Sequence, residues 1–307
     1  MDTPFNTTSY TADFIQNLQA PDLMRVIAAT DPSVYNGGST GGITDYFNIR
    51  GFSVSSSDIG FGGLYGLIPY YRVTPEMAER VEVLKGPSAL LNGMPPGGSV
   101  GGAINLVPKR ADDAPLTRLS VDHGADAQLG GHVDVGRRLG HRNQRGVRGN
   151  AVHRDGDGAI RHQDKAYQLG SLALDWRGER SRASLDLYSA EDLIHGPTRG
   201  VSLDVGVAVP KPPRADVLIN PEWGRVESRD KGAILRGEVD FNDHLMGYAA
   251  FGASETDYSY NGAISALVLN NAGDFRTTVA QLAVHTRKQS ADVGVRGSVQ
   301  TGPVSHQ

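Results

Sequence analysis

Residues 79–110 decide the fold and read ERVEVLKGPSALLNGMPPGGSVGGAINLVPKR. The stretch opens with a short apolar run of strand length at residues 81–84, and Gly86 and Pro87 then end that strand because proline cannot continue a ladder of hydrogen bonds. Pro87 suits the first position of a helix, so residues 87–91 predict one helical turn. The first half is therefore expected to be strand, turn and short helix.

The second half of the stretch is rich in glycine. Asn92 and Gly93 supply the left-handed residue that ends a helix, and the glycines that follow leave a backbone with few bulky side chains. Residues 103–107 then predict a second strand, which Pro108 stops. We expect structural roles for Gly86, Gly93, Gly97, Gly98, Gly101 and Gly102. For the last four, the reason is either a positive φ or close approach of the backbone to a surrounding wall of the protein.

This order of residues resembles the plug domain of TonB-dependent outer-membrane receptors, whose second half carries a closely similar run. Upstream, residues 48–52 (NIRGF) resemble the family's IRGF element, and residues 75–80 (PEMAER) resemble its usual lead-in. The alternative is a glycine-rich loop in a soluble α/β protein. Three matches in the family's order favour the plug.

Composition agrees with a β-rich protein. The chain has 39 Gly among 307 residues, which suits many turns, and no apolar run is long enough to span a bilayer as a helix. Barrel strands alternate apolar and polar residues, so a mean hydropathy of −0.32 does not exclude a membrane. Lys plus Arg number 30 against 34 Asp plus Glu, without a basic cluster, and we expect no nucleic-acid partner.

No sequence motif predicts catalysis or a bound cofactor. The chain has no cysteine, its nine histidines lack ligand spacing, and no nucleotide-binding, zinc-protease or nucleophile-elbow motif is present. Residues 97–102 lack the helix that a phosphate-binding loop needs, and residues 155–158 offer too few oxygen ligands for calcium. We expect neither an enzyme nor a metal site.

Residues 1–112 are expected to form the α+β plug. Apolar spacing predicts two short helices on either side of Pro21. Strands are expected at residues 46–50 and, interrupted, at 64–71, and Thr74 suits the N-cap of a helix at 75–80.

Residues 113–307 are expected to begin an antiparallel transmembrane β-barrel. At residues 233–241 apolar odd positions alternate with charged even ones, and short connections alternate with long ones along the chain. The rhythm predicts about eight or nine of the roughly 22 strands of plugged transporters. A parity switch within residues 282–299 predicts a turn near 288–290 or a bulge. Five aromatic residues are candidates for interfacial girdles: Trp176, Phe241, Tyr248, Tyr258 and Tyr260.

The resemblance also implies where a ligand binds. The plug apex takes part in binding in this family, so we expect ligand contacts from Arg50, the loop at residues 53–61, Tyr65, Tyr70 and Asn92. A guanidinium suits an anionic or hydroxamate-rich iron chelate. An ion pair with the barrel wall is the alternative for Arg50 and the favoured role for Arg80 and Arg110.

The resemblance implies a receptor in the Gram-negative outer membrane, surrounded by its lipid. It would capture a ferric siderophore or similar chelate and pass it inward, driven by the TonB–ExbB–ExbD complex. The alternatives are a siderophore-sensing signalling receptor and a soluble ligand-binding β protein with an accessory domain. The N-terminus shows no secretory signal, and the predicted strands are too few to close a barrel. We therefore expect this chain to be part of a longer receptor, and we expect that the chain alone cannot transport.

Overall fold

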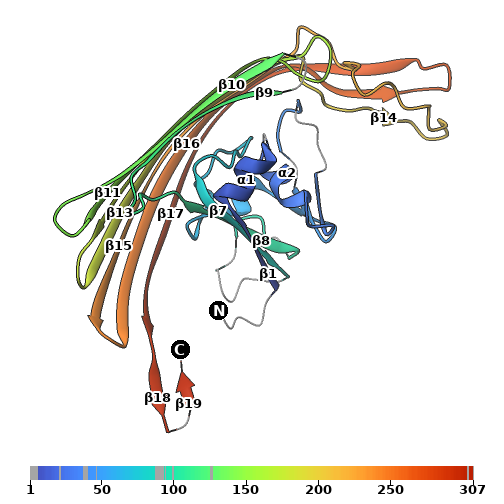
Figure 1. Cartoon of the computed structure of the whole chain (residues 1–307). Coiled ribbons are helices and arrows are strands. Elements are labelled where there is room, and N and C mark those ends of the chain that lie inside the picture. Colours follow the sequence, from blue (N-terminus) through green and yellow to red (C-terminus); the bar gives the residue numbers. More distant parts are fainter. Residues whose placement is uncertain are drawn as a thin grey trace.

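The computed structural model describes residues 6–20, 22–36, 41–45, 47–86, 93, 95–98, 100–124, 127–302 and 304–306. Figure 1 shows a small mixed unit lying against the concave face of a large, curved sheet. We call the small unit, up to residue 111, the plug. None of its described helices is long and apolar enough to cross a membrane.

The plug is built from short elements around its own sheet. That five-stranded sheet has the order β1 (Asn6–Thr11), β7 (Ala78–Lys85), β8 (Gly102–Pro108), β5 (Ile59–Phe61) and β6 (Leu64–Tyr65). A second sheet pairs β2 (Val34–Asn36), β3 (Phe47–Ile49) and β4 (Phe52–Val54). The helical elements are α1 (Ala12–Leu18), α2 (Leu23–Ala28) and the 3₁₀ turn η1 (Ser56–Asp58).

Local chemistry sets both α-helices where the apolar spacing predicts them. The hydroxyl of Thr11 accepts a hydrogen bond from Phe14 N, and the carboxylate of Asp22 accepts one from Arg25 N at 2.9 Å. Gln19 ends α1 in the left-handed region at φ 50°. Each cap satisfies backbone groups that a helix end leaves free.

Two predictions for the plug are wrong. The helix expected at residues 75–80 is absent, because β7 already begins at Ala78 and the hydroxyl of Thr74 bonds to that of Tyr167 in the large sheet. The strand expected over 64–71 shortens to β6, since the residues beyond it contact the large sheet instead of a neighbouring plug strand. The helical turn expected at 87–91 lies outside the described residues.

The large sheet contains nine strands in the order β14-β16-β15-β13-β12-β11-β10-β9, with β17 paired to β16. All pairs are antiparallel except β14 with β16. The bounds are β9 (Leu116–Gly124), β10 (Gln128–Leu139), β11 (Arg145–Asp157), β12 (Asp164–Arg177), β13 (Ser181–His195), β14 (Ser202–Leu203), β15 (Arg225–Asn242), β16 (Leu245–Val268) and β17 (Phe275–Gly297). A separate hairpin, β18 (Val299–Thr301) and β19 (Val304–His306), follows.

From β10 onward, short and long connections lie at opposite ends of the strands. The short ones are residues 140–144, 178–180 and 243–244, and the long ones are 158–163, 196–224 and 269–274. In Figure 1 the long connections gather around β14, far from the C-terminal hairpin. The strand number and the rhythm confirm the predicted fold, a plug followed by an unclosed antiparallel sheet of barrel type.

The two faces of the large sheet differ in chemistry. The face turned away from the plug exposes aliphatic and aromatic side chains, such as Leu119, Leu235, Phe251 and Val293 at 52–80% exposure. The face turned toward the plug buries polar groups, including Asp134 at 0% exposure. This inside-out arrangement is expected of a barrel wall with lipid outside and a polar lumen.

The parity switch in residues 282–299 is neither a turn nor a bulge in β17, which runs unbroken and pairs residue for residue with β16 through 288–290. On its outward face, Val293 belongs to the apolar band, whereas Arg287 and His285, nearer the long connections, are polar. The switch therefore marks where the strand leaves the apolar band. The surroundings of the side chains change at this point, whereas the backbone continues as a regular strand.

Two of the five aromatic residues lie where a girdle would require, and a girdle role for them stays a prediction. Trp176 and Phe241 are 42% and 57% exposed, close to short connections. Tyr258 and Tyr260 are instead buried on the plug side, and the guanidinium of Arg296 lies 4.7 Å from the ring centre of Tyr248. Alternation along β16 places all three tyrosines on even positions, which face the lumen.

Candidate ligand-binding end and plug–sheet interface

The register of the sheet fixes which end of the plug faces the long connections. Asp192 lies near the long-connection end of β13, and Asp186 lies nearer its short-connection end. Plug residue Arg72 pairs with Asp192, whereas Arg110 pairs with Asp186. The plug segments at residues 41–45 and 70–74 therefore face the long loops.

Arg72 is the electrostatic centre of this end. It is 4% exposed, and its Nε donates to Asp192 Oδ2 at 2.7 Å while Nη1 donates to Asp45 Oδ1 at 2.8 Å. Its Nη2 donates to the carbonyl of Gly42 at 2.7 Å. Burial alone would lower the pKa of Arg72, but Asp192 and Asp45 outweigh it and hold that pKa above its ordinary value. The guanidinium stays charged and ties plug to wall.

An aromatic and cationic corner lies beside Arg72. The rings of Tyr71 and Tyr258 stack at 3.7 Å, Tyr70 meets Tyr71 edge-on at 4.8 Å, and Lys288 Nζ lies 4.9 Å from the ring centre of Tyr70. Burial raises the pKa of Tyr71, with smaller contributions from Tyr70 and Asp230, so its hydroxyl stays protonated. Such a corner can offer ring faces, hydroxyl donors and a positive charge to an anionic aromatic chelate.

Asp230 links this corner to the wall. Its carboxylate accepts hydrogen bonds from Tyr70 N at 2.9 Å, Thr256 Oγ1 at 2.6 Å and Ser228 Oγ at 2.7 Å. The residue is 5% exposed. Three donors compensate for the burial of its oxygens and fix the backbone of Tyr70.

The opposite end of the plug carries a second charged cluster. Lys109 Nζ donates to Asp134 Oδ2 at 2.9 Å and to Asn150 Oδ1 at 3.1 Å, and Arg148 also binds Asp134. Burial lowers the pKa of Lys109, and the charge of Asp134 opposes that shift. Arg110 forms a two-pronged pair with Asp186, so it lies in a plug–wall ion pair of the expected kind.

Between the two clusters the wall binds plug backbone. Arg236 Nη2 donates to Phe61 O at 2.6 Å, and Tyr188 Oη donates to Leu67 O at 2.7 Å. Lys288 Nζ and Ser254 Oγ reach the carbonyls of Ile68 and Gly66, each at 3.3 Å. These bonds depend on the path of the plug backbone and not on its side chains.

The predicted ligand residues do not all come together. Arg50 is exposed at φ 52°, its N donates to Ser33 O at 2.7 Å, and its guanidinium lies beside Gly86. These contacts are with the plug, and no described contact joins Arg50 to Tyr70. Tyr65 is half-buried in β6, and burial, with Asp58 nearby, raises its pKa. Asn92 lies outside the described residues.

The ion pair expected between Arg80 and the barrel wall stays a prediction, because Arg80 makes no ion pair with the wall residues that the structure describes. Its Nε pairs with Glu82 Oε1 at 2.8 Å, within β7 itself. Residues two apart share a face of a strand, so this neighbour is closer than any carboxylate of the wall. Both side chains are more than a third exposed, and the pair stabilises little.

The glycines divide into two groups. Gly86, Gly93 and Gly98 adopt φ of +97°, +70° and +68°, which other residues rarely adopt. The others approach atoms of the plug and not the barrel wall, which corrects that expectation: a Cβ would lie 2.4 Å from Asp58 Oδ2 at Gly97, 2.3 Å from Ile49 O at Gly101 and 2.4 Å from Leu84 O at Gly102.

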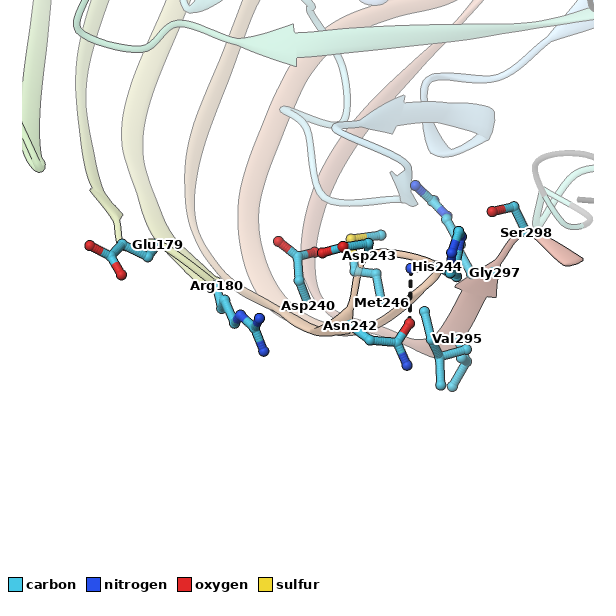
Figure 2. Close-up of a pocket in the computed structure, with 12 residues that line it drawn as sticks. Glu179, Arg180, Asp240, Asn242, Asp243, His244, Met246, Val295, Gly297 and Ser298 are labelled. Carbon is cyan, nitrogen blue, oxygen red and sulfur yellow. Dashed lines mark hydrogen bonds between the residues drawn. The ribbon is translucent and has the colours of Figure 1, made fainter.

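Two hollows lie away from the aromatic corner. One has a volume of about 860 Å³ and lies at the short connection between β15 and β16, where Asn242 Oδ1 accepts a hydrogen bond from His244 N at 2.8 Å. Figure 2 shows the residues that line it. A second, of about 410 Å³, lies between α1 and β9–β12 beside Glu76 and Arg154. Among the described residues, Glu255, Asp257 and His285 could together reach a metal ion, but they lie on the outward face and bear on neither hollow.

Comparison with known proteins decides the family. Residues 1–102 match the model of the TonB-dependent Receptor Plug Domain. Residues 1–102 therefore belong to the plug domain of TonB-dependent receptors. It is 39% identical over 307 residues to the ferrichrome receptor FcuA of Yersinia enterocolitica, covering 99% of this chain and 40% of that protein.

Solved receptors agree with that assignment. The crystal structure of BauA, the ferric preacinetobactin receptor from Acinetobacter baumannii, superposes with a TM-score of 0.97 at 53% identity, covering 99% of this chain and 45% of BauA. FpvA of P. aeruginosa, bound to a pyoverdine–iron complex, shares the fold with a TM-score of 0.84 at 17% identity, covering 99% of this chain and 41% of FpvA. The chain thus spans less than half the length of these relatives.

Sequence reasoning missed Arg72, Lys109 and Asp230. A signal was available for Asp230, because it occupies a position on its strand that alternation assigns to the lumen face, where a charge needs a partner. Arg72 and Lys109 directly follow a predicted strand and a predicted strand stop. Their partners are 120 and 25 residues away, and only the fold brings them together.

Proposed function

We propose that the full-length receptor takes up a ferric siderophore across the outer membrane. The observation that supports this most is the fit to BauA, at 53% identity and a TM-score of 0.97 over 99% of this chain. That identity covers the plug, the lumen face and the long connections together. The alternative considered from the sequence, a soluble ligand-binding β protein, does not account for a plug that lies against the polar face of the sheet.

The ligand is proposed to meet the plug at the corner formed by Tyr70, Tyr71 and Lys288. Two aromatic rings and an ammonium group suit a chelate that carries planar aromatic donors and negative charge. Ferric preacinetobactin is therefore the first probe, by analogy with BauA, and ferrichrome is the second, by analogy with FcuA. The structural neighbours of Arg50 favour a role inside the plug for that side chain.

Energy for release is proposed to come from the TonB–ExbB–ExbD complex. The plug is held by buried ion pairs at both ends and by hydrogen bonds to its backbone between them. Removing one partner of a buried pair costs about 3–5 kcal/mol, so displacement of the plug needs an external source of work. The outer membrane and its lipid supply none.

A binding titration tests the proposal. Purified full-length receptor in detergent is titrated with ferric preacinetobactin, ferrichrome and a ferric pyoverdine, and one of the first two is expected to bind. Tyr70→Ala should weaken that binding about tenfold or more, the loss of roughly 1.4 kcal/mol of contact. Arg50→Ala should leave it unchanged.

Two controls accompany the titration. Arg80→Ala removes an arginine that pairs within β7, and it should bind as wild type does. Heat-modifiable migration checks that each variant forms a barrel. Absence of binding by all three chelates would argue against the proposal. If only Arg50→Ala weakened binding, the ligand would contact Arg50 at the plug apex, as predicted from the sequence, and not the aromatic corner.

A further inference from the structure

Gln163 joins three separate segments of the receptor. It lies in the connection between β11 and β12 and is 4% exposed. Its Nε2 donates to Gly196 O at 2.7 Å and lies 3.3 Å from Gly41 O and 3.5 Å from Thr198 Oγ1. Gly41 belongs to the plug, while Gly196 and Thr198 begin the long connection between β13 and β15.

The plug also bonds directly to that connection. Thr198 N donates to Gly41 O at 2.9 Å, and an isolated parallel bridge joins Gly42 to Thr198. The carbonyl of Gly41 thus accepts from both the loop backbone and Gln163. We call Gly41, Gly42, Gln163, Gly196 and Thr198 the clasp.

The rest of the connection is fixed to the wall and to itself. Residues 196–224 close at their base, where Gly196 N donates to Gly224 O at 2.8 Å. Arg161 pairs with Asp216 at 3.0 Å, and β14 pairs with β16. The backbone hydrogen bond and the bridge that join the described plug residues Gly41 and Gly42 directly to this loop both belong to the clasp, so the clasp is where a change in plug position would reach the loop.

We propose that Gln163 is a positioning residue that couples the plug to the loop at residues 196–224. With the plug seated, the clasp holds the base of the loop against Gly41 and Gly42. When the plug moves, the carbonyl of Gly41 moves with it, and the base of the loop loses its hydrogen bond to the plug. The loop position therefore reports the plug position at the end of the receptor where ligand enters.

Steric detail supports a close fit between the two sides. A Cβ at Gly41 would lie 1.9 Å from Gln163 Oε1 and 2.5 Å from Nε2, so even alanine forces the amide away. The amide cannot withdraw without losing its bond to Gly196 O. Gly41→Ala therefore opens the clasp from the plug side, and Gln163→Leu opens it from the wall side.

A spin label on the loop tests the coupling without any siderophore. Residues 1–307 contain no cysteine, and Val201 is 42% exposed between Thr198 of the clasp and β14, so Val201→Cys places one label in this part of the receptor. In full-length receptor, Gln163→Leu and Gly41→Ala should each shorten the rotational correlation time of the label about twofold, as expected for a loop freed to move on the nanosecond scale. Gln168→Leu is the matched control, an exposed glutamine on β12 that should change nothing.

The double variant separates coupling from two independent defects. If both substitutions open one clasp, Gln163→Leu with Gly41→Ala should mobilise the label no more than either alone, since contacting residues are non-additive. Additive effects would overturn the proposal, as would unchanged mobility in both single variants or an equal change in Gln168→Leu. Heat-modifiable migration verifies folding, and the Gly41→Ala arm remains informative if Gln163→Leu fails to assemble. Neither result bears on siderophore binding.

Discussion

The plug and the sheet bury opposite kinds of side chain. The plug core is apolar and sealed, with Leu23, Val26, Ile59, Val83 and Ile104 at 0% exposure. The sheet has its apolar side chains on the outside and its charges inside, toward the plug. The comparison teaches that the plug is organised around an apolar core, whereas the sheet has a polar inner face that the plug covers and an apolar outer face that lipid would suit.

The boundary between the two regions follows from that difference. A few apolar side chains of the sheet, such as Val152 and Leu169, join the plug core, but buried ion pairs and backbone hydrogen bonds make the other contacts. Polar groups of this kind can exchange protein partners for water, which an apolar core cannot do without a large cost. The interface is therefore the natural place for the plug to separate.

Arg72→Met should weaken the contact between plug and sheet more than any other change considered. It leaves Asp45 and Asp192 buried without their shared cation, which should destabilise the seated plug by about 3–5 kcal/mol. Urea-dependent thiol labelling of Leu67→Cys, a position of 0% exposure that packs against Gly252 of the wall, measures separation of the plug in the full-length receptor. Arg214→Met, which removes an exposed pair with Asp216, should change it by less than about 0.5 kcal/mol. Equal effects would refute a special role for Arg72.

Phe251→Arg should test the outer face of the sheet. Phe251 is 52% exposed on the apolar side of β16, where an arginine near the bilayer midplane should cost about 2–4 kcal/mol. Ser259→Arg, on the same face of the same strand but beyond the apolar band, should cost about 1 kcal/mol or less. Folding titrations into lipid vesicles measure both. Similar costs for the two would mean that the apolar band is misplaced.

Gly101→Val should show how tightly the plug core is packed. Its Cβ would lie 2.3 Å from Ile49 O, a backbone atom that cannot move freely, and overpacking of this kind costs about 1–3 kcal/mol. Gly98→Val faces open space and should cost only about 1 kcal/mol for its positive φ. Thiol labelling of Val83→Cys measures both. A reversed order would show that the positive φ at Gly98 costs more than the close approach at Gly101.

Asp31→Asn should give the smallest effect, and it should depend on pH. Asp31 pairs with Lys85 Nζ at 2.8 Å and accepts two hydrogen bonds from Ser33. Burial would raise the pKa of Asp31, but these partners together hold that pKa below its ordinary value of 3.8. The unfolded plug then binds the proton more readily, so the stabilisation is complete above pH 3.8 and is lost as pH falls through the lowered pKa.

The pH dependence provides the check. Wild type should exceed Asp31→Asn by about 1.5 kcal/mol in plug stability at pH 7, and the gap should close in strong acid. A gap that is constant with pH would assign the effect to packing of the amide and not to charge.

Periodicity predicted the regular parts of this molecule well. Alternation at residues 233–241 located a sheet face, and the rhythm of connections gave the strand number. It failed where environment changes along one strand, as in β17, and where tertiary contacts override local signals, as at Thr74, whose hydroxyl bonds to Tyr167 and caps no helix.

The candidate site was less predictable because its residues come from distant segments. Tyr70 was identified from the resemblance, but its partners Asp230 and Lys288 are contributed by β15 and β17. Arg50 was also assigned to the apex from the resemblance, and its guanidinium lies beside Gly86 of the plug, with no described contact to Tyr70. Local patterns specify strands, whereas a site between two units depends on how they dock.

Uptake of iron tests the central claim most directly. Cells that lack their own siderophore receptors and express the full-length protein are supplied with radioactive ferric preacinetobactin or ferrichrome, with TonB present or absent. The account predicts that one of these chelates delivers iron to the cell only when TonB is present, while surface binding is the same in both strains. Equal iron accumulation without TonB would contradict a plug that needs external work to move, and binding without accumulation in either strain would contradict an uptake receptor.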